Sequence, residues 1–297
     1  MKKLIFLVTV LILISCKKEL KEDFTLTEID NLTSLTDVEN YIMLLDSMFS
    51  KENYRLEMIK DSTRLVQPFC IGDFDNNGYK DLFIVGRDKY DFIYSYAFMS
   101  FGKDSIKIFN FHEDDDLIPK VIRKNNQDLL AVKSGIRFQF SKDTLIYKYD
   151  GFVSYNENLK KYNIEKITFN GSSDKGDYDI IIDQNLDAKF KLTKGIYDTL
   201  YFYKADRKLS LKEYNELIEL LNYTDFPNLK EEYFERSTSH SMCDLVITYN
   251  HGKTKHIFDK GMRNNYSLKT FYSKLEDLKK TVQLEPAGKG LLSDEDE

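Results

Sequence analysis

The chain has 297 residues, of which 42% are hydrophobic and 31% charged, and its formal net charge is −6. This balance is typical of an ordinary globular protein and argues against nucleic acid as a partner. Tyrosine and phenylalanine are abundant (20 and 21 residues) while tryptophan is absent, which favours β-rich structure with aromatic side chains in the cores.

The first 15 residues have the pattern of a secretory signal peptide. Lys2 and Lys3 form a basic start, and an apolar run follows from Leu4 to Ile14. The run is too short to span a bilayer, for which about 20 residues are needed. We therefore expect these residues to be an export signal and not part of the fold.

The signal ends in Leu13-Ile14-Ser15-Cys16, which resembles the lipobox of bacterial lipoproteins. The resemblance implies that Cys16 carries acyl chains and becomes the mature N-terminus, anchoring the protein to a membrane. Because Lys17 and not aspartate follows, it also implies an outer-membrane lipoprotein of the cell envelope. The alternative is an ordinary signal peptide with a chance cysteine. Residues 16–30 are predicted to be a charged tether.

The remaining chain is long enough for two domains, and the first is predicted over residues 31–165. Thr36 and Glu39 have the spacing of a capping box at a helix start. Apolar residues recur on one face of that helix, namely Val38, Tyr41, Ile42, Leu45 and Phe49. Strand-like runs follow at 65–71, 82–85, 92–101, 106–111, 129–132, 136–140 and 145–149. Since the connections are short, we expect one helix with an antiparallel β-meander.

A possible metal site lies in this domain, in the sequence Gly72-Asp73-Phe74-Asp75-Asn76-Asn77-Gly78-Tyr79-Lys80-Asp81. Ca²⁺ prefers six to eight oxygen ligands, and alternate residues of a tight loop can direct their side chains to one point. Gly78 permits the positive φ that bends such a loop. The predicted ligands are the side chains of Asp73, Asp75, Asn77 and Asp81 with the backbone carbonyl of Tyr79. The alternative is an acidic hairpin that turns at Asn77-Gly78.

This loop resembles the calcium-binding motif of integrin-type FG-GAP and VCBS repeats, D-x-D-x-[DN]-G-x-x-D-[LI]. Each ligand position of that motif is matched, which implies structural calcium. The repeats form propellers of four to eight blades, however, and this chain has no second copy of the motif. We therefore expect one calcium loop within a smaller β domain.

The second domain is predicted over residues 166–284 and is also α+β. It has strand-like runs at 164–169, 178–182, 188–192 and 199–203, a helix that begins at a Ser210–Glu213 capping box, a hairpin over 245–258 and a last helix over 268–282. Residues 170–173 are expected to be a loose segment, and the acidic tail 285–297 is expected to be disordered.

This order of elements resembles an uncharacterised α+β domain of bacterial lipoproteins. The matching segments are 178–182, the helix start at 209–211 and the hairpin at 244–252. That domain often has a cysteine pair where this chain has Ser172 and Ser173. The resemblance implies a fold but no activity.

Three histidines and a cysteine lie close together in the sequence, His240, Cys243, His251 and His256, as zinc ligands would. If His251-Gly252 is a two-residue turn, however, His256 lies opposite Ile247 on the buried face while His251 is at the exposed tip. We therefore expect a core histidine at position 256. Cys70 and Cys243 are expected to be separate buried thiols.

Three classes of function follow from these patterns. The first is a non-catalytic envelope lipoprotein with a calcium-stabilised β domain that binds an unknown partner or serves in assembly. The second is a glycan-binding surface lipoprotein, favoured by the many tyrosines and a calcium loop on a β scaffold. The third is a hydrolase, although no nucleophile motif or phosphate-binding glycine loop is recognisable.

Overall fold

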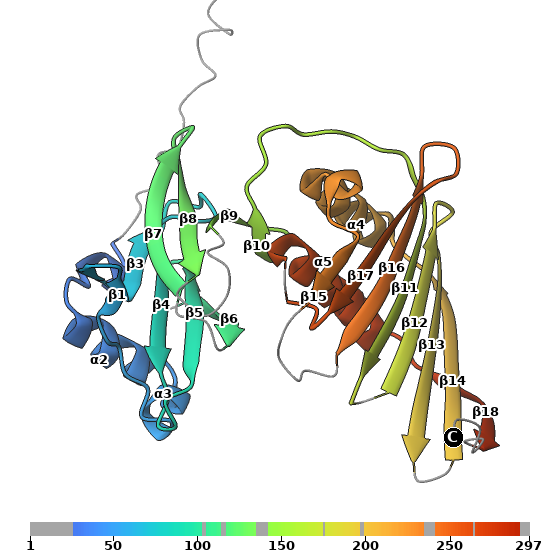
Figure 1. Ribbon diagram of the computed structural model, residues 1–297, viewed down its shortest axis with the longest axis horizontal. Helices are drawn as coiled ribbons and strands as arrows, with labels where there is room; N and C mark the ends of the chain where they lie inside the picture. Colours follow the sequence, from blue (N-terminus) through green and yellow to red (C-terminus); the bar gives the residue numbers. More distant parts are fainter. Residues whose placement is uncertain are drawn as a thin grey trace, which may run out of the picture. The chain divides into compact units, whose positions relative to one another are not determined.

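The computed structural model describes residues 26–102, 105–113, 117–134, 142–174, 176–196, 199–234, 241–263 and 265–291. The predicted signal peptide, Cys16 and the strand predicted at 136–140 lie outside these residues. The chain divides into two compact units, residues 1–128 with 133–141, and residues 129–132 with 142–297 (Figure 1). The fold is α+β with sheets that are antiparallel at nearly every pairing, as the sequence predicts.

The helices of the first unit begin at short polar side chains. The backbone N–H of Asp37 donates to Ser34 Oγ at 3.1 Å, so the capping box is Ser34–Asp37 and the predicted Thr36–Glu39 box is wrong. The single predicted helix is also interrupted. Asp46 ends one helix and caps the next by accepting a hydrogen bond from Met48 N at 2.8 Å. The helical elements are η1 (Glu28–Asn31), α2 (Leu35–Leu45) and α3 (Ser47–Lys51).

The start of this unit lies earlier than predicted. Ile29 in η1 is fully buried and belongs to the same core as α2 and the sheet. The predicted tether of residues 16–30 therefore ends before η1, because Ile29 loses contact with water only when it packs on the core.

A four-stranded meander in the order β3-β4-β5-β6 forms the sheet of the first unit. The strand predicted at 65–71 is split into two, because Pro68 has no N–H to continue a ladder. Val38, Ile42 and Phe49 pack on this sheet against Leu82 and Phe98. The strands are β1 (Ile59–Asp61), β2 (Arg64–Val66), β3 (Phe69–Gly72), β4 (Asp81–Arg87), β5 (Ile93–Ser100) and β6 (Ile106–Glu113).

A second four-stranded sheet has the order β10-β9-β8-β7. Strands β7 and β10 are not predicted from the sequence. The predicted domain boundary lies at residue 165, whereas β9 and β10 group with the second unit. The strands are β7 (Leu117–Lys124), β8 (Gln127–Ser134), β9 (Lys142–Lys148) and β10 (Gly151–Ser154).

The second unit contains an eight-stranded sheet in the order β15-β17-β16-β11-β12-β13-β14-β18. Two longer helices lie on one side of it (Figure 1). The Tyr272 ring of α5 contacts the Phe169 ring of β11, and the Tyr214 hydroxyl of α4 donates to Ile164 O at 3.2 Å. The predicted Ser210–Glu213 capping box is confirmed. The elements are β11 (Ile164–Ser173), β12 (Gly176–Asp183), β13 (Asp187–Ile196), β14 (Thr199–Lys208), α4 (Leu211–Thr224), η2 (Phe226–Asn228), β15 (Glu232–Phe234), β16 (Met242–Tyr249), β17 (Lys253–Lys260), α5 (Tyr266–Lys280) and β18 (Glu285–Leu291).

Two segments predicted to be irregular are strands. Residues 170–173 continue β11, where Asn170 pairs with Asp179 and Asp244 on its two neighbours. Residues 285–291, predicted to be disordered, pair with β14 as strand β18. The backbone groups of an open sheet edge can recruit a polar segment whose own sequence has little strand propensity.

The register of the β16–β17 hairpin corrects the prediction for His256. Three residues with positive φ, Asn250, His251 and Gly252, form the turn, so Tyr249 pairs with Lys253 and Val246 with His256. A shift of one residue moves every side chain to the opposite face of a strand. His256 is therefore exposed beside Asp244, and its predicted place in the core is wrong.

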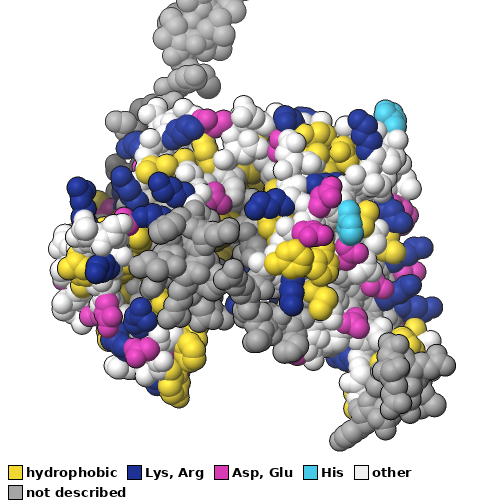
Figure 2. All heavy atoms as spheres, in the orientation of Figure 1, with side chains coloured by type: hydrophobic (Ala, Val, Ile, Leu, Met, Phe, Trp, Pro, Cys, Tyr) yellow, Lys and Arg dark blue, Asp and Glu magenta, His cyan; other side chains and the backbone are white. Residues whose placement is uncertain are grey.

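The face of the second unit seen in Figure 2 carries a hydrophobic patch over β15 and β17 among charged side chains. Phe234 and Met242 are 61% and 39% exposed, and the Phe234 ring lies 6.0 Å from that of Phe258. Among the residues that the structure describes, no helix is both long and apolar enough to cross a membrane.

Candidate metal centre

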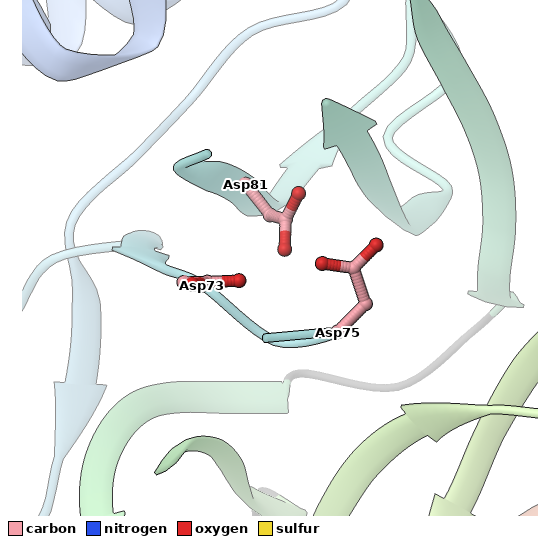
Figure 3. A group of neighbouring side chains, drawn as sticks. All are labelled: Asp73, Asp75 and Asp81. Atoms are coloured by element: carbon pink, nitrogen blue, oxygen red, sulfur yellow. The ribbon is translucent and has the colours of Figure 1, made fainter. Parts of the chain in front are cut away.

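The loop between β3 and β4 brings three carboxylates together, as the sequence spacing predicts. Figure 3 shows Asp73, Asp75 and Asp81 directed toward one common point. One carboxylate oxygen of each residue lies within 4.8 Å of the other two. Gly72 and Asp81 pair across the two strands, so the loop returns to the sheet beside the point where it left. The pairing of β3 with β4 thus closes the ring of carboxylates.

Hydrogen bonds within the loop hold it in a tight turn. Asp73 Oδ1 accepts from Asn77 N at 3.0 Å, and Asp73 Oδ2 accepts from Gly78 N at 2.9 Å. Asp75 Oδ1 also accepts from Asn77 N, at 3.1 Å. Gly78 has a φ of 92°, which an L side chain rarely adopts. The local sequence therefore determines the turn that directs the side chains inward.

Asp81 is the most deeply buried of the three and is anchored to neighbouring strands. It accepts hydrogen bonds from Phe74 N and Ser100 N, both at 2.8 Å, and its side chain has no exposed surface. Burial raises the pKa of Asp81 to about 8, and the nearby charges of Asp75 and Asp73 contribute to the rise. The ionised form is therefore costly in the metal-free protein.

The pKa of Asp75 is also raised, to about 6, chiefly by burial and further by the charge of Asp73. Among the described residues, no lysine or arginine forms an ion pair with any of the three carboxylates. Lys80, the nearest basic residue in the sequence, pairs instead with Asp128 at 3.2 Å. The cluster consequently concentrates negative charge without a basic side chain to balance it.

The other predicted ligands lie at the edge of the cluster. Asn77 Nδ2 donates to Asp75 Oδ2 at 3.0 Å and to Ser100 O at 2.7 Å, while Asn77 Oδ1 accepts from Tyr79 N at 2.8 Å. The ring of Tyr79 lies against Gly102, where a Cβ atom would come within 2.6 Å of Tyr79 Cζ. This packing holds the loop against the end of β5.

Asp128 of β8, which is not predicted from the sequence, supports the loop. Its Oδ2 accepts from Asp73 N and from Lys80 Nζ, both at 3.2 Å. Asp128 lies 55 residues after Asp73, and no spacing rule connects the two. Only the tertiary structure could reveal this contact.

The donor set fits a hard cation. All side-chain donors of the loop are carboxylate or amide oxygens, which suit Ca²⁺ or Mn²⁺ and not the softer zinc ion. Within the described residues, the cysteine and histidine side chains near the β16–β17 hairpin do not come together as the ligands of one metal ion would. Cys243 is buried on β16, directly opposite Asp259 of β17, whereas His256 is exposed beside Asp244. His240 lies outside the described residues.

The two cysteines that the structure describes are both free. Burial raises the pKa of the Cys243 thiol to about 12 and that of Cys70 further still. Neither is a thiolate at neutral pH, and a thiolate is the form that attacks as a nucleophile.

One family of domains matches part of the chain. A domain of unknown function (DUF6438) matches residues 176–279, which extend from β12 to α5 and make up less than half of the chain. The match includes the segments 178–182, 209–211 and 244–252. No curated protein and no solved structure matches the chain.

Proposed function

We propose that this protein is a lipid-anchored envelope protein whose first unit is stabilised by calcium and which acts as a non-catalytic binding or assembly module. The convergence of Asp73, Asp75 and Asp81 is the observation that carries this proposal. Three carboxylates at such short range repel one another, and a divalent cation between them converts the repulsion into attraction.

Asp73, Asp75 and Asp81 would hold the ion, and the side chain of Asn77 and the carbonyl of Tyr79 would complete its oxygen ligands. Bound calcium supplies positive charge that ties β3 to β4. The same carboxylates accept backbone hydrogen bonds from Phe74, Asn77, Gly78 and Ser100. Because these bonds link the loop to β5 as well, the expected role of the ion is to stabilise the fold.

Anchoring would come from acyl chains on Cys16, the last residue of Leu13-Ile14-Ser15-Cys16. Stable attachment needs more than one chain, since a single acyl chain binds a membrane only marginally. With Lys17 after the cysteine, the expected location is the outer membrane.

The metal assignment is tested on the mature chain purified without chelator. After dialysis against about 1 mM calcium, elemental analysis should find about one equivalent of calcium beyond that in the dialysate and no zinc. Titration calorimetry of the metal-stripped protein should show calcium binding. Asp81→Asn should weaken this binding strongly. Asp177→Asn, which changes an exposed carboxylate on β12, is the matched control and should leave it unchanged. Stoichiometric zinc, or calcium binding that Asp81→Asn does not alter, would contradict the assignment.

A further inference from the structure

A polar cavity of about 570 Å³ lies within the second unit. It is lined by the segment after β10, by the end of α4 and by the start of α5, including Ser154, Lys160, Thr224, Asp225 and Ser267. Cavities of a few hundred cubic ångströms commonly hold small ligands. All of its lining residues belong to the second unit, outside the carboxylate cluster.

The walls of this cavity are held by hydrogen bonds. Ser154 Oγ donates to Asp143 Oδ2 at 2.7 Å, and Ser154 N donates to Ser267 Oγ at 3.0 Å. Asn156 Nδ2 donates to Tyr223 O at 2.7 Å, which ties the segment after β10 to α4. Side chains fixed in this way lose little conformational entropy when a ligand binds.

The two charged groups of the cavity neutralise each other. Lys160 Nζ lies 2.9 Å from Asp225 Oδ2, and Asp225 also accepts hydrogen bonds from the Tyr162 hydroxyl at 2.5 Å and from Asn228 Nδ2 at 2.8 Å. An anionic ligand would meet the Asp225 carboxylate, and a cationic ligand would meet Lys160. The charge pattern therefore favours a neutral ligand.

The polar atoms that remain offer both donors and acceptors. Thr224 Oγ1 donates to Leu220 O at 2.7 Å and retains lone pairs that can accept. Ser267 is buried, and its Oγ accepts from Ser154 N within the wall. Asn158, exposed at the rim, adds an amide that can do both. Hydroxyl groups, which donate and accept at once, are the ligand groups that satisfy such a wall.

We propose that this cavity binds a neutral saccharide of one or two sugar units. Leu229 is the single aliphatic side chain among the residues that line it, so an apolar ligand would leave buried polar groups unsatisfied. Tyr155, which is half-buried, is also among the lining residues, and an aromatic ring is a surface on which the C–H face of a sugar can pack. This binding does not depend on the proposed calcium site.

The test is saturation-transfer NMR on the mature full chain, with calcium and with chelator. The neutral probes are glucose, galactose, mannose, N-acetylglucosamine and their disaccharides, and the charged probes are glucuronate, glucosamine and inorganic phosphate. At least one neutral sugar should bind with a millimolar or lower dissociation constant, under both conditions, and more tightly than every charged probe.

Two variants assign the binding to the cavity. Thr224→Val and Asn158→Ala each remove one neutral hydrogen-bonding group, and each should weaken binding by about 2- to 10-fold. Asn185→Ala, at the exposed turn between β12 and β13, is the control and should change nothing. Absence of transfer to every neutral sugar would overturn the proposal, and so would tighter binding of a charged probe. Binding that both cavity variants leave unchanged would overturn it as well.

Discussion

Replacing Asp75 by asparagine removes one negative charge from the carboxylate cluster with almost no change in shape. In the metal-free protein the pKa of Asp75 is raised from 3.8 to about 6. A carboxyl group with a higher pKa in the folded state binds its proton more tightly when folded. Its contribution to stability is therefore present at low pH and is lost as the pH rises from about 4 to about 6. Because Asp75 is only partly buried, solvent screening reduces this loss to about 2 kcal/mol at neutral pH.

The asparagine variant avoids most of this loss. Its Oδ1 can still accept from Asn77 N, but its amide cannot accept from Asn77 Nδ2, which costs about 1 kcal/mol. We therefore expect chelated Asp75→Asn to be more stable than the chelated wild type by about 1 kcal/mol at neutral pH. Below about pH 4 the wild-type carboxyl is protonated and the advantage should disappear.

Calcium should act on the wild type and much less on the variant. Extracellular calcium modules bind with Kd values of about 0.1 to 1 mM. With about 1 mM calcium and a Kd of about 0.1 mM, binding stabilises the fold by about 1.4 kcal/mol. This corresponds to a rise of about 4–8 °C in Tm for a unit of this size. Asp75→Asn replaces a charged ligand by a neutral one, so its Tm should change much less.

Differential scanning calorimetry of the mature chain, with calcium and with chelator at acidic and neutral pH, measures these effects. The control is Asp177→Asn, which should follow the wild type. Calcium should move the transition of the first unit and leave that of the second unaltered. The reasoning is refuted if chelated Asp75→Asn is less stable than the wild type while calcium raises the Tm of both proteins equally. If calcium moves the transition of neither protein, the loop is an ordinary acidic turn.

Three further outcomes are expected. Cys16→Ala should abolish labelling by a radioactive fatty acid and release the protein from the membrane fraction, and label retained on the variant would exclude this anchor. The hydrogen bonds from Arg207 lower the pKa of Glu213 to about 2. The ionised Glu213 side chain therefore stabilises the fold above about pH 4.5, and this contribution is lost as the pH falls toward 2. Glu213→Gln should therefore cost about 1 kcal/mol in urea unfolding at neutral pH and much less near pH 2, whereas an equal cost at both pH values would contradict this sign. Gly86→Ala places a Cβ atom 2.5 Å from Arg55 O. It should therefore lower the free energy of unfolding by about 1–3 kcal/mol. An unchanged urea midpoint would show that strand β4 can shift at no cost.

The sequence by itself determined the features that depend on neighbours along the chain. The spacing of Asp73, Asp75 and Asp81 predicted their convergence, because a tight loop with Gly78 at its turn directs alternate side chains inward. The Ser210–Glu213 capping box was likewise readable, since both of its hydrogen bonds join residues three positions apart. Hydrophobic periodicity located most strands and the two helices of the second unit.

Only the tertiary structure decided which distant residues meet. Asp128 supports the loop from another strand, and the sequence does not mark this contact. The face on which His256 lies depends on a single residue of turn length, because strand side chains alternate with a period of two. Strand β18 forms because β14 offers it an open edge, which composition alone could not indicate. The polar cavity has the same origin, since its walls come from segments that are far apart in the chain and meet only when the helices pack on the sheet.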